Sequence, residues 1–239
     1  MTTKKTVLIT GANQGLGFET AKQLAELGYY VYMGSRDSAK GIAAKQKLNE
    51  SGFSNVEFIE IDVTDLNSIK SARQELEAKS QRLDVLINNA GISGGLITQN
   101  MSTYDIENLR KVFETNFYGA VQTTQQFIDL LKRSNEPRIV NVSSGLGSLG
   151  FSFSHDLAFY AYGCSKTALN AFTVSLAKEL RDTNFKINSV EPGYTATNLN
   201  QYQGTQTPEQ AVGIIVKYAT VSNDAPTGKF FWKEGEFAW

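Results

Sequence analysis

The 239-residue sequence predicts an α/β fold in which helices cover both faces of a parallel sheet of about seven strands. Short apolar runs alternate with longer amphipathic segments along the whole chain, as in repeated strand–helix–strand units. Several of these runs, such as Val85–Ile87, are apolar without interruption, which is typical of strands buried on both faces. Together these observations predict a doubly wound parallel sheet.

The pattern places each element in chain order. The predicted strands are Thr6–Thr10, Tyr30–Gly34, Val56–Ile61, Val85–Asn88, Arg138–Val142, Lys186–Glu191 and Gly228–Phe231. Between them, helical periodicity lies near Gly15–Leu27, Ser38–Glu50, Ser68–Ser80, Asp105–Lys132, Tyr160–Arg181 and Pro208–Ala219. No repeat, low-complexity tract or linker interrupts the alternation, so we expect residues 1–239 to form a single domain.

Composition excludes several functional classes. The 23 basic and 24 acidic residues give a net charge of −1, without the basic stripe of a nucleic-acid-binding surface. A single cysteine, Cys164, excludes an internal disulfide, and we expect it to be a small buried thiol. The apolar run Val7–Ile9 is too short for a signal peptide or a membrane span. We expect a cytoplasmic protein with no nucleic-acid, membrane or metal partner; His155, the only histidine, is interpreted as a solvated loop residue.

A glycine-rich turn joins the first strand to the first helix, with the sequence Thr10-Gly11-Ala12-Asn13-Gln14-Gly15-Leu16-Gly17. Its glycines bring the backbone close to a pyrophosphate, and the helix N-terminus supplies free N–H groups. The alternative is a turn without a ligand. A second glycine pattern, Gly145–Gly150, also follows a strand. We do not expect Phe151–Asp156 to continue it as a helix, so we interpret 145–150 as a flexible loop.

Tyr162 and Lys166 are spaced to share one face of a helix, with Cβ atoms about 5–6 Å apart. A phenol with a pKa near 10 is a weak acid at neutral pH, and little of it is present as the phenolate base. A neighbouring ammonium group favours the phenolate and lowers this pKa toward the working range. A tyrosine and a lysine at this spacing often occur by chance. The pair is significant here because it directly follows the fifth strand and the serines at the end of that strand.

The first glycine turn, T-G-x-x-x-G-x-G, resembles that of the short-chain dehydrogenase/reductase family. Later landmarks follow in the family's order: Asp62-Val63, Asn88-Asn89-Ala90-Gly91, Asn116, Ser144, Tyr162 with Lys166, and Pro192-Gly193 through Thr197. The resemblance covers nearly the whole chain and implies a Rossmann-type dinucleotide-binding domain. Asn13, the long interval between Ser144 and Tyr162, and the chain end Gly235–Trp239 look like the carbonyl-reductase branch.

The resemblance implies roles for individual residues. Tyr162 would donate a proton to a carbonyl oxygen during hydride transfer, while Lys166 lowers the pKa of Tyr162 and binds the cofactor ribose. Ser144, rather than Ser143, would bond the substrate oxygen, and Asn116 would hold a water that links Lys166 to solvent. The implied cofactor-binding residues are Gly11, Asn13, Gln14, Gly15, Leu16, Gly17, Arg36, Asp62, Val63, Asn89, Ala90, Gly91, Tyr162, Lys166, Pro192, Gly193, Thr195 and Thr197.

The end of the second strand predicts NADP(H). An NAD enzyme places a carboxylate there for the ribose 2′-hydroxyl, whereas arginine suits the 2′-phosphate. Ser35 takes the acidic position and Arg36 follows it; we expect Asp37 to turn away as the first residue or cap of the next helix. Gln14 stands where NADP enzymes often carry a basic residue, so one supporting charge is missing.

These features predict an NADPH-dependent reductase of small-molecule ketones or aldehydes. The alternatives are a 3-oxoacyl thioester reductase and an NADP sensor without chemistry; the complete catalytic set disfavours the sensor. We expect pocket loops near 94–101, 148–157 and 194–202. Their aromatic residues predict an apolar pocket, and these residues are Phe151, Phe153, Tyr194 and Tyr202.

Apolar residues lie on more than one side of the predicted helix Asp105–Lys132, and they include Phe113, Phe117, Val121 and Phe127. Pairing of this helix in a homodimer or homotetramer would bury them, and so would the extra loop after Ser148. The sequence leaves both arrangements open.

Overall fold

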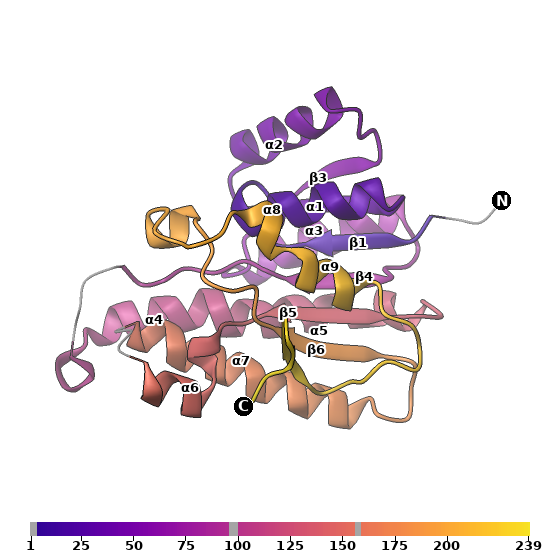
Figure 1. The fold of residues 1–239 in the computed structure, drawn as a ribbon. Coiled ribbons are helices and arrows are strands. Elements are labelled where there is room, and N and C mark those ends of the chain that lie inside the picture. Colours follow the sequence, from indigo (N-terminus) through magenta and orange to yellow (C-terminus); the bar gives the residue numbers. More distant parts are fainter. Residues whose placement is uncertain (1–3, 96–99, 156–158) are drawn as a thin grey trace.

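In the computed structural model, which describes residues 4–95, 100–155 and 159–239, eight strands form one sheet in the order β3-β2-β1-β4-β5-β6-β7-β8 (Figure 1). Strands β1 to β7 pair in parallel, and β8 pairs antiparallel with β7. The strands are β1 (Thr6–Ile9), β2 (Tyr30–Ser35), β3 (Val56–Glu60), β4 (Val85–Asn88), β5 (Arg138–Val142), β6 (Lys186–Val190), β7 (Phe230–Trp232) and β8 (Gly235–Glu236).

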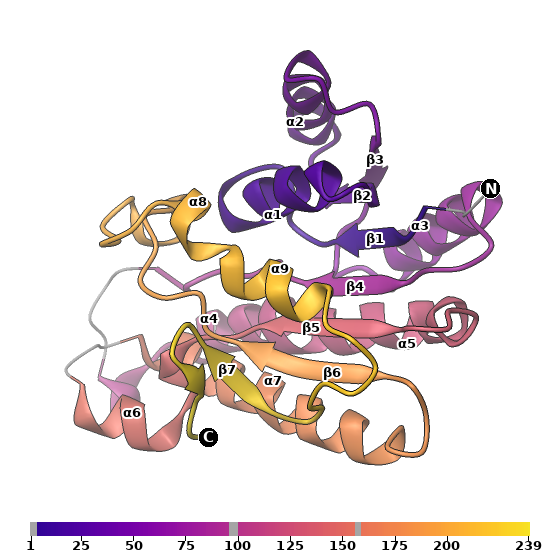
Figure 2. The same ribbon diagram turned by 45° about the vertical axis from the view of Figure 1, so that its right-hand side comes forward.

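Helices cover both faces of the sheet (Figures 1 and 2). One face carries α1 (Gly15–Glu26), α2 (Ser38–Glu50) and α9 (Gly213–Ala219), with α8 (Pro208–Ala211) leading into α9. The other carries α3 (Leu66–Lys79), α4 (Ile106–Phe113), α5 (Gly119–Lys132) and α7 (Tyr160–Glu179). The short segments are η1 (Met101–Thr103), η2 (Glu114–Tyr118), η3 (Gly145–Gly147), α6 (Leu149–Ser154) and η4 (Asn198–Asn200).

Alternation along each strand divides the apolar residues into two cores. In β1, Val7 and Ile9 face the cluster under α1, α2 and α9, while Leu8 faces the cluster under α3, α5 and α7. All three are fully buried. This two-sided burial explains why the strands are apolar without interruption, and it confirms the predicted doubly wound architecture.

The structure corrects two sequence expectations. Residues 145–150 are not a flexible loop: Gly145, Leu146 and Gly147 form the buried turn η3, and Leu149–Ser154 is the short helix α6. The sheet also has an eighth strand, because the chain turns back at Gly235 and pairs with β7. The predicted helix Asp105–Lys132 is present as α4 and α5, joined by one π-helical turn, η2.

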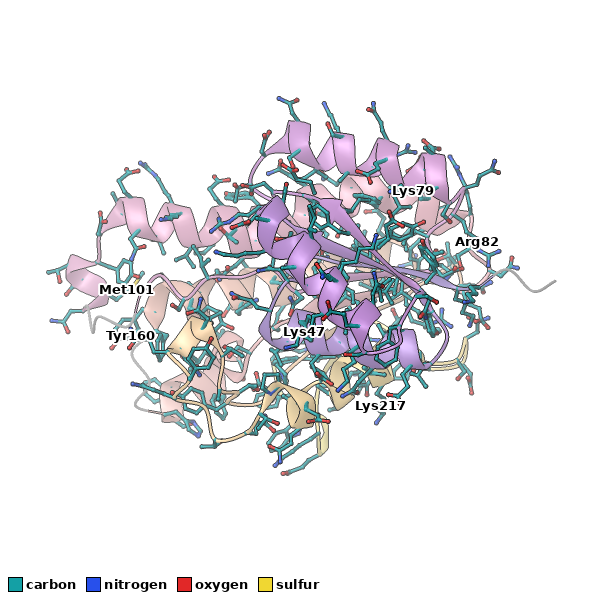
Figure 3. The ribbon with its side chains drawn as sticks, turned by 90° about the horizontal axis from the view of Figure 1, so that it is seen from above. Lys47, Lys79, Arg82, Met101, Tyr160 and Lys217 are labelled. Atoms are coloured by element: carbon teal, nitrogen blue, oxygen red, sulfur yellow. The ribbon has the colours of Figure 1, made fainter. Side chains whose placement is uncertain are left out.

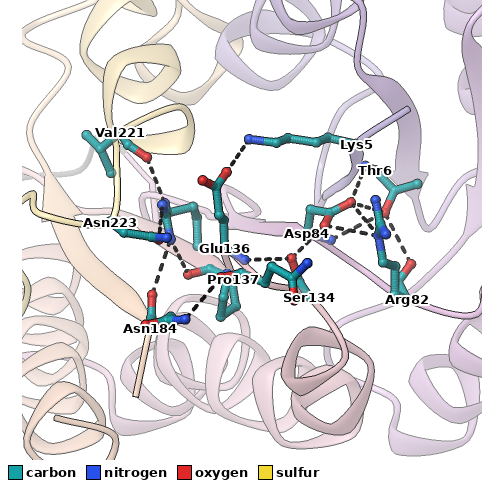
Figure 4. Close-up of polar contacts among 12 residues, drawn as sticks. Lys5, Thr6, Arg82, Asp84, Ser134, Glu136, Pro137, Asn184, Val221 and Asn223 are labelled. Carbon is teal, nitrogen blue, oxygen red and sulfur yellow. Dashed lines mark hydrogen bonds and ion pairs between the residues drawn. The ribbon is translucent and has the colours of Figure 1, made fainter. Parts of the chain in front are cut away.

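A polar network closes the amino-terminal edge of the sheet, opposite the glycine turn (Figure 4). Arg138 is 2% exposed, and its Nε donates to the carbonyl oxygen of Val221 at 2.9 Å. Asp84 accepts from the backbone N–H of Thr6 at 2.8 Å. Further members are Lys5, Arg82, Ser134, Glu136, Asn184 and Asn223, with Lys5 and Glu136 forming an ion pair. These bonds satisfy polar groups that burial would otherwise destabilise.

Charged side chains project from the outer surface of the helices (Figure 3). Met101 and Tyr160 lie at the end of the molecule opposite Lys79 and Arg82 (Figure 3). Over the described residues, no helix is both long and apolar enough to cross a membrane.

Candidate active site

The glycine turn after β1 is shaped for a close approach by a ligand. Gly11 and Gly15 have positive φ angles of 65° and 57°, a conformation that side chains rarely adopt. A Cβ on Gly17 would lie 2.5 Å from the carbonyl oxygen of Gly11, so any side chain there would displace the turn. Gln14 is the N-cap of α1 and makes no side-chain capping bond with any described residue. The first N–H groups of α1 therefore suit an anionic ligand.

Asn89 and Ala90 hold this turn from the neighbouring strand end. The Asn89 side chain donates to the carbonyl oxygens of Thr10 at 2.8 Å and of Gly11 at 3.2 Å. The Thr10 hydroxyl accepts from the backbone N–H groups of Asn89 and Ala90, both at 3.0 Å. From the other side, the Thr197 methyl group lies 3.5 Å from the place of a Cβ on Gly15. The segment after β6 therefore lies beside the glycine turn.

Asp62 and Val63 follow β3 at the same edge of the sheet. The Asp62 carboxylate accepts from the Thr64 backbone N–H at 2.9 Å and from its hydroxyl at 2.7 Å. Val63 is 6% exposed and packs against Gly119 at the start of α5, where a Cβ would lie 2.8 Å from the valine. Asp62 is thus held by its own turn, and Val63 belongs largely to the packing between β3 and α5.

Tyr162, Lys166 and Ser144 meet at the carboxyl end of β5. The Lys166 ammonium lies 5.5 Å from the centroid of the Tyr162 ring and donates to the carbonyl oxygen of Val142 at 2.7 Å. The Ser144 hydroxyl lies beside the Tyr162 phenol group and lowers the pKa of Tyr162, whereas the Ser143 hydroxyl is buried and has no hydrogen-bond partner among the described residues. Of the two serines, Ser144 is the one that contacts Tyr162.

Burial governs the charge states of this cluster. It raises the pKa of Tyr162 well above its ordinary value, and the Glu191 carboxylate raises it further, while Ser144 acts in the opposite direction. Burial also lowers the pKa of Lys166 to about 8, against the attraction of Glu191. Burial is the largest influence on the pKa of Tyr162, and the expectation that Lys166 lowers this pKa stays a prediction. Tyr162 carries its proton at neutral pH.

Asn116 lies in the π-helical turn η2 and is 1% exposed. Its amide nitrogen donates to the Ile92 carbonyl oxygen and to the Ser165 hydroxyl, both at 2.9 Å, and its amide oxygen accepts from the Ile92 N–H at 2.8 Å. The Ser165 hydroxyl in turn donates to the Tyr162 carbonyl oxygen at 2.7 Å. Asn116 thus ties the segment after β4 to α7, and π-helical turns often occur at functional sites.

The structure corrects two predictions about the pocket wall, those for Phe153 and Tyr202. Phe151 lines the cavity, but Phe153 is 95% exposed, because residues two apart on a helix point to nearly opposite sides. Tyr202 is 69% exposed and is not part of the cavity wall. Cys164 is exposed rather than buried. His155 stacks on Phe151 with ring centroids 3.7 Å apart.

The glycines of the second pattern pack η3 against α7. A Cβ on Gly147 would lie 3.0 Å from atoms of Lys166 and Asn170. Across the same contact, a Cβ on Gly163 would lie 3.0 Å from the carbonyl oxygen of Leu146. These glycines therefore allow two backbones to approach closely beside Lys166, and they do not form a second phosphate site.

A cavity of about 640 Å³ opens above these groups. Of the predicted loops, Tyr194–Tyr202 supplies much of its wall, Ser148–Leu157 supplies Phe151, and residues 156–158 lie outside the described residues. In the loop 94–101, Gly94 and Gly95 line a second cavity, and residues 96–99 are not described. Sequence reasoning missed other wall residues, which are Glu191, Phe159, Ile214, Trp232 and Phe237.

One of these missed residues left a signal in the sequence. Glu191 is a carboxylate at the end of a strand whose other residues are buried or nearly so, directly before Pro192-Gly193. Its Oε1 accepts from the Gly193 N–H at 2.7 Å, and its Oε2 accepts from the Gly145 N–H. Phe237 left no such signal, because only the return of the chain end through β8 brings it to the cavity.

The end of β2 matches the interpretation of its charges. Asp37 caps α2, since its carboxylate accepts from the Lys40 N–H at 3.0 Å and pairs with the Lys40 ammonium at 3.3 Å. The Ser35 hydroxyl is bonded to the backbone of Asp37. Arg36 is exposed at the second cavity and has no hydrogen bond or ion pair to another described residue. The prediction that Asp37 is a helix cap is confirmed.

Some predicted features stay expectations after the structure. In the segment α4–α5, Phe127 is fully buried in the core, while Phe113 and Phe117 are half-buried and contact each other edge-on. The oligomeric state therefore stays a prediction. The described residues contain no group of three or more His, Cys, Asp or Glu side chains that could hold a metal ion.

A doubly wound sheet with a glycine turn after β1 and a Tyr–Lys–Ser cluster at its carboxyl edge defines a nucleotide-dependent oxidoreductase. A family model described as short chain dehydrogenase matches residues 5–208. The chain belongs to this family, whose members use a nicotinamide cofactor and act on alcohol and ketone groups.

Known proteins with similar sequences and structures include reductases of ketones. The (+)-neomenthol dehydrogenase of Capsicum annuum is 33% identical, over 98% of this chain and 97% of that protein. The structure of salutaridine reductase from Papaver somniferum has a TM-score of 0.84 at 28% identity, over 96% of this chain and 100% of that one. NADPH-bound carbonyl reductase from chicken fatty liver has a TM-score of 0.86 at 26% identity and covers 99% of both chains.

Proposed function

We propose that the protein is an NADPH-dependent reductase of ketones or aldehydes, with Tyr162 as the proton donor. The observation that carries the proposal is that Ser144 lies beside Tyr162, a half-buried phenol with a raised pKa, on the wall of one cavity. Burial keeps the proton on the phenol until a stronger acceptor forms. A carbonyl oxygen that gains negative charge is such an acceptor.

The chain's own residues divide the work. Tyr162 donates its proton to the substrate oxygen, and Ser144 bonds the same oxygen from the end of β5. Lys166 donates one N–H to the Val142 carbonyl oxygen, and its other two N–H groups are available to the ribose hydroxyls of the cofactor. Asn116 fixes α7 through Ser165 and thereby the position of Tyr162. NADPH, when bound, supplies the hydride.

The residues present fit this cofactor. The positive-φ glycines of the turn and the uncapped start of α1 suit a pyrophosphate, and Arg36, unpaired within the described residues, supplies a guanidinium for the 2′-phosphate. Three structural relatives that are at least 25% identical are described with NADP or NADPH bound, and one of them is the chicken carbonyl reductase. The preference for NADP(H) over NAD(H) follows from Arg36 and from the absence of a free carboxylate at the end of β2.

The cavity favours uncharged substrates with a large apolar surface. Its wall includes Leu146, Phe151, Phe159, Trp232 and Phe237, while Ser144, Lys166 and Glu191 place polar groups near Tyr162. The relatives named neomenthol dehydrogenase and salutaridine reductase support cyclic ketones as the substrate class. We therefore expect cyclic or aromatic ketones to be reduced better than small oxo acids.

Tyr162→Phe tests the proposal, because it removes the transferable proton and keeps the ring. We expect NADPH binding within about twofold of wild type and a loss of kcat of about a thousandfold or more. The measurements are NADPH fluorescence titration and NADPH absorbance with a panel of ketones, aldehydes and 3-oxoacyl thioesters. Near-normal turnover by Tyr162→Phe would refute the role of Tyr162, and a thioester as the best substrate would replace the substrate class.

A further inference from the structure

Glu191 is a half-buried carboxylate in the site, and neither the family resemblance nor the steps above assign it a task. It leaves β6 at the carboxyl edge of the sheet, where its backbone N–H donates to the Phe231 carbonyl oxygen at 2.7 Å. Its side chain lines the same cavity as Tyr162 and Lys166. A charge at such a depth is costly unless it has partners.

The two carboxylate oxygens join two loops. Oε2 accepts from the N–H of Gly145, the residue directly after Ser144, and Oε1 accepts from the N–H of Gly193. Burial raises the pKa of Glu191, whereas the N–H donors of Gly145 and Gly193 and the Lys166 ammonium favour its ionised form. The carboxylate therefore fixes the backbone beside Ser144 to the loop after β6.

The same carboxylate acts on both titrating groups of α7. Its attraction opposes the burial that lowers the pKa of Lys166, and its repulsion of the phenolate raises the pKa of Tyr162. In the described structure, the backbone N–H of Gly145 after β5 and the Phe231 carbonyl oxygen of β7 contact Glu191, and the titratable groups that interact with its charge are Lys166 and Tyr162. Lys217 and Lys233 line the outer cavity but are exposed, and solvent screens their charges.

We propose that Glu191 is a positioning residue that supplies the counter-charge of Lys166 while its two oxygens hold the backbone beside Ser144 and Gly193. The proposal rests on the proposed reductase function. With Glu191 ionised, Lys166 stays an ammonium and Tyr162 stays a phenol over a wider range of pH. Both are the forms that carbonyl reduction needs.

Glu191→Gln tests the charge, because glutamine has nearly the same shape and still offers one acceptor oxygen. Without the negative charge, Lys166 and Tyr162 both lose their protons at lower pH. The alkaline limb of the pH profile of kcat/KM for ketone reduction should therefore move to lower pH by roughly one unit. The profile is measured from about pH 6 to about pH 10 with saturating NADPH.

Two further variants make the result decisive. Glu191→Asp keeps the charge but is too short to reach both N–H groups, so kcat should fall while the alkaline limb stays within about 0.3 units of wild type. Glu136→Gln, which removes the ion-pair partner of Lys5 at the opposite edge of the sheet, should leave the profile unchanged. Thermal unfolding of each variant reports whether it folds. If Glu191→Gln does not fold, the position of the alkaline limb of Glu191→Asp tests the proposal by itself.

The inference is overturned if Glu191→Gln keeps the wild-type limb and differs only in kcat or KM, since Glu191 then merely braces the loops. It is also overturned if the limb of Glu191→Asp moves to lower pH by a full unit. These outcomes are distinct from failure of the reductase function, which appears as activity in Tyr162→Phe.

Discussion

We expect Arg36, at the end of β2, to set the preference for NADPH by binding its 2′-phosphate, and Arg36→Ala tests this. The guanidinium is exposed at the second cavity and unpaired within the described chain, so it is available to a phosphate. The nearby carboxylate of Asp37 caps α2 and pairs with Lys40, so a ribose hydroxyl would compete with these contacts.

The magnitude follows from the type of contact. A charge-assisted hydrogen bond is typically worth about 1.5–3 kcal/mol. Because Arg36 is exposed, solvent screening favours the lower end of this range. Since 1.4 kcal/mol corresponds to a factor of ten, wild type should prefer NADPH about tenfold, and Arg36→Ala should remove most of that preference.

The assay compares kcat/KM for NADPH and NADH at one fixed ketone concentration. Arg36→Ala should raise the KM for NADPH about tenfold and leave NADH almost unchanged. Arg110→Ala is the matched control: Arg110 lines the same cavity, but its guanidinium is bonded to Glu107 at 2.6 Å, so the ratio should change less than about twofold. If wild type uses both cofactors equally and Arg36→Ala changes neither, Arg36 is only a solvated charge.

Two further substitutions test the cofactor turn and the pocket wall. Gly17→Ala places a Cβ 2.5 Å from the Gly11 carbonyl oxygen, so NADPH affinity in a fluorescence titration should fall about tenfold or more. The control Gly150→Ala, which has open space around it, should bind NADPH normally. Equal affinities of the two variants would contradict NADPH binding at the glycine turn. Phe151→Ala should raise the KM for cyclic ketones roughly tenfold, because Phe151 lines the cavity. Phe153→Ala, at an exposed position, should leave this KM unchanged. Equal effects of the two variants would contradict the placement of Phe151 on the cavity wall.

Much of the scaffold was predictable because its signals are local. Uninterrupted apolar runs marked the buried strands, and the glycine turn after β1 marked the point where the chain must adopt positive φ angles. Asp37 was identified as a helix cap from its place before α2. Each signal depends on a few neighbouring residues, so it can be read without knowing the rest of the fold.

The resemblance to a family brought Asn116, Ser144, Tyr162 and Lys166 into one predicted site, but it did not determine their environment. The pKa of Tyr162 rises rather than falls, because burial and Glu191 act on it together. Neither influence is encoded near Tyr162 in the sequence. Both arise where the ends of β5 and β6 meet α7.

The sequence by itself was sufficient to predict the layered α/β sheet, the glycine turn after β1 and the placement of Arg36 at the end of β2. Only the tertiary structure decided which residues form the pocket wall. Phe151 faces the cavity and Phe153 faces solvent because residues 149–154 are helical, and Phe237 reaches the site because β8 turns the chain end back. Local pattern fixes which face of an element is apolar, whereas convergence at a sheet edge depends on contacts between residues far apart in the chain.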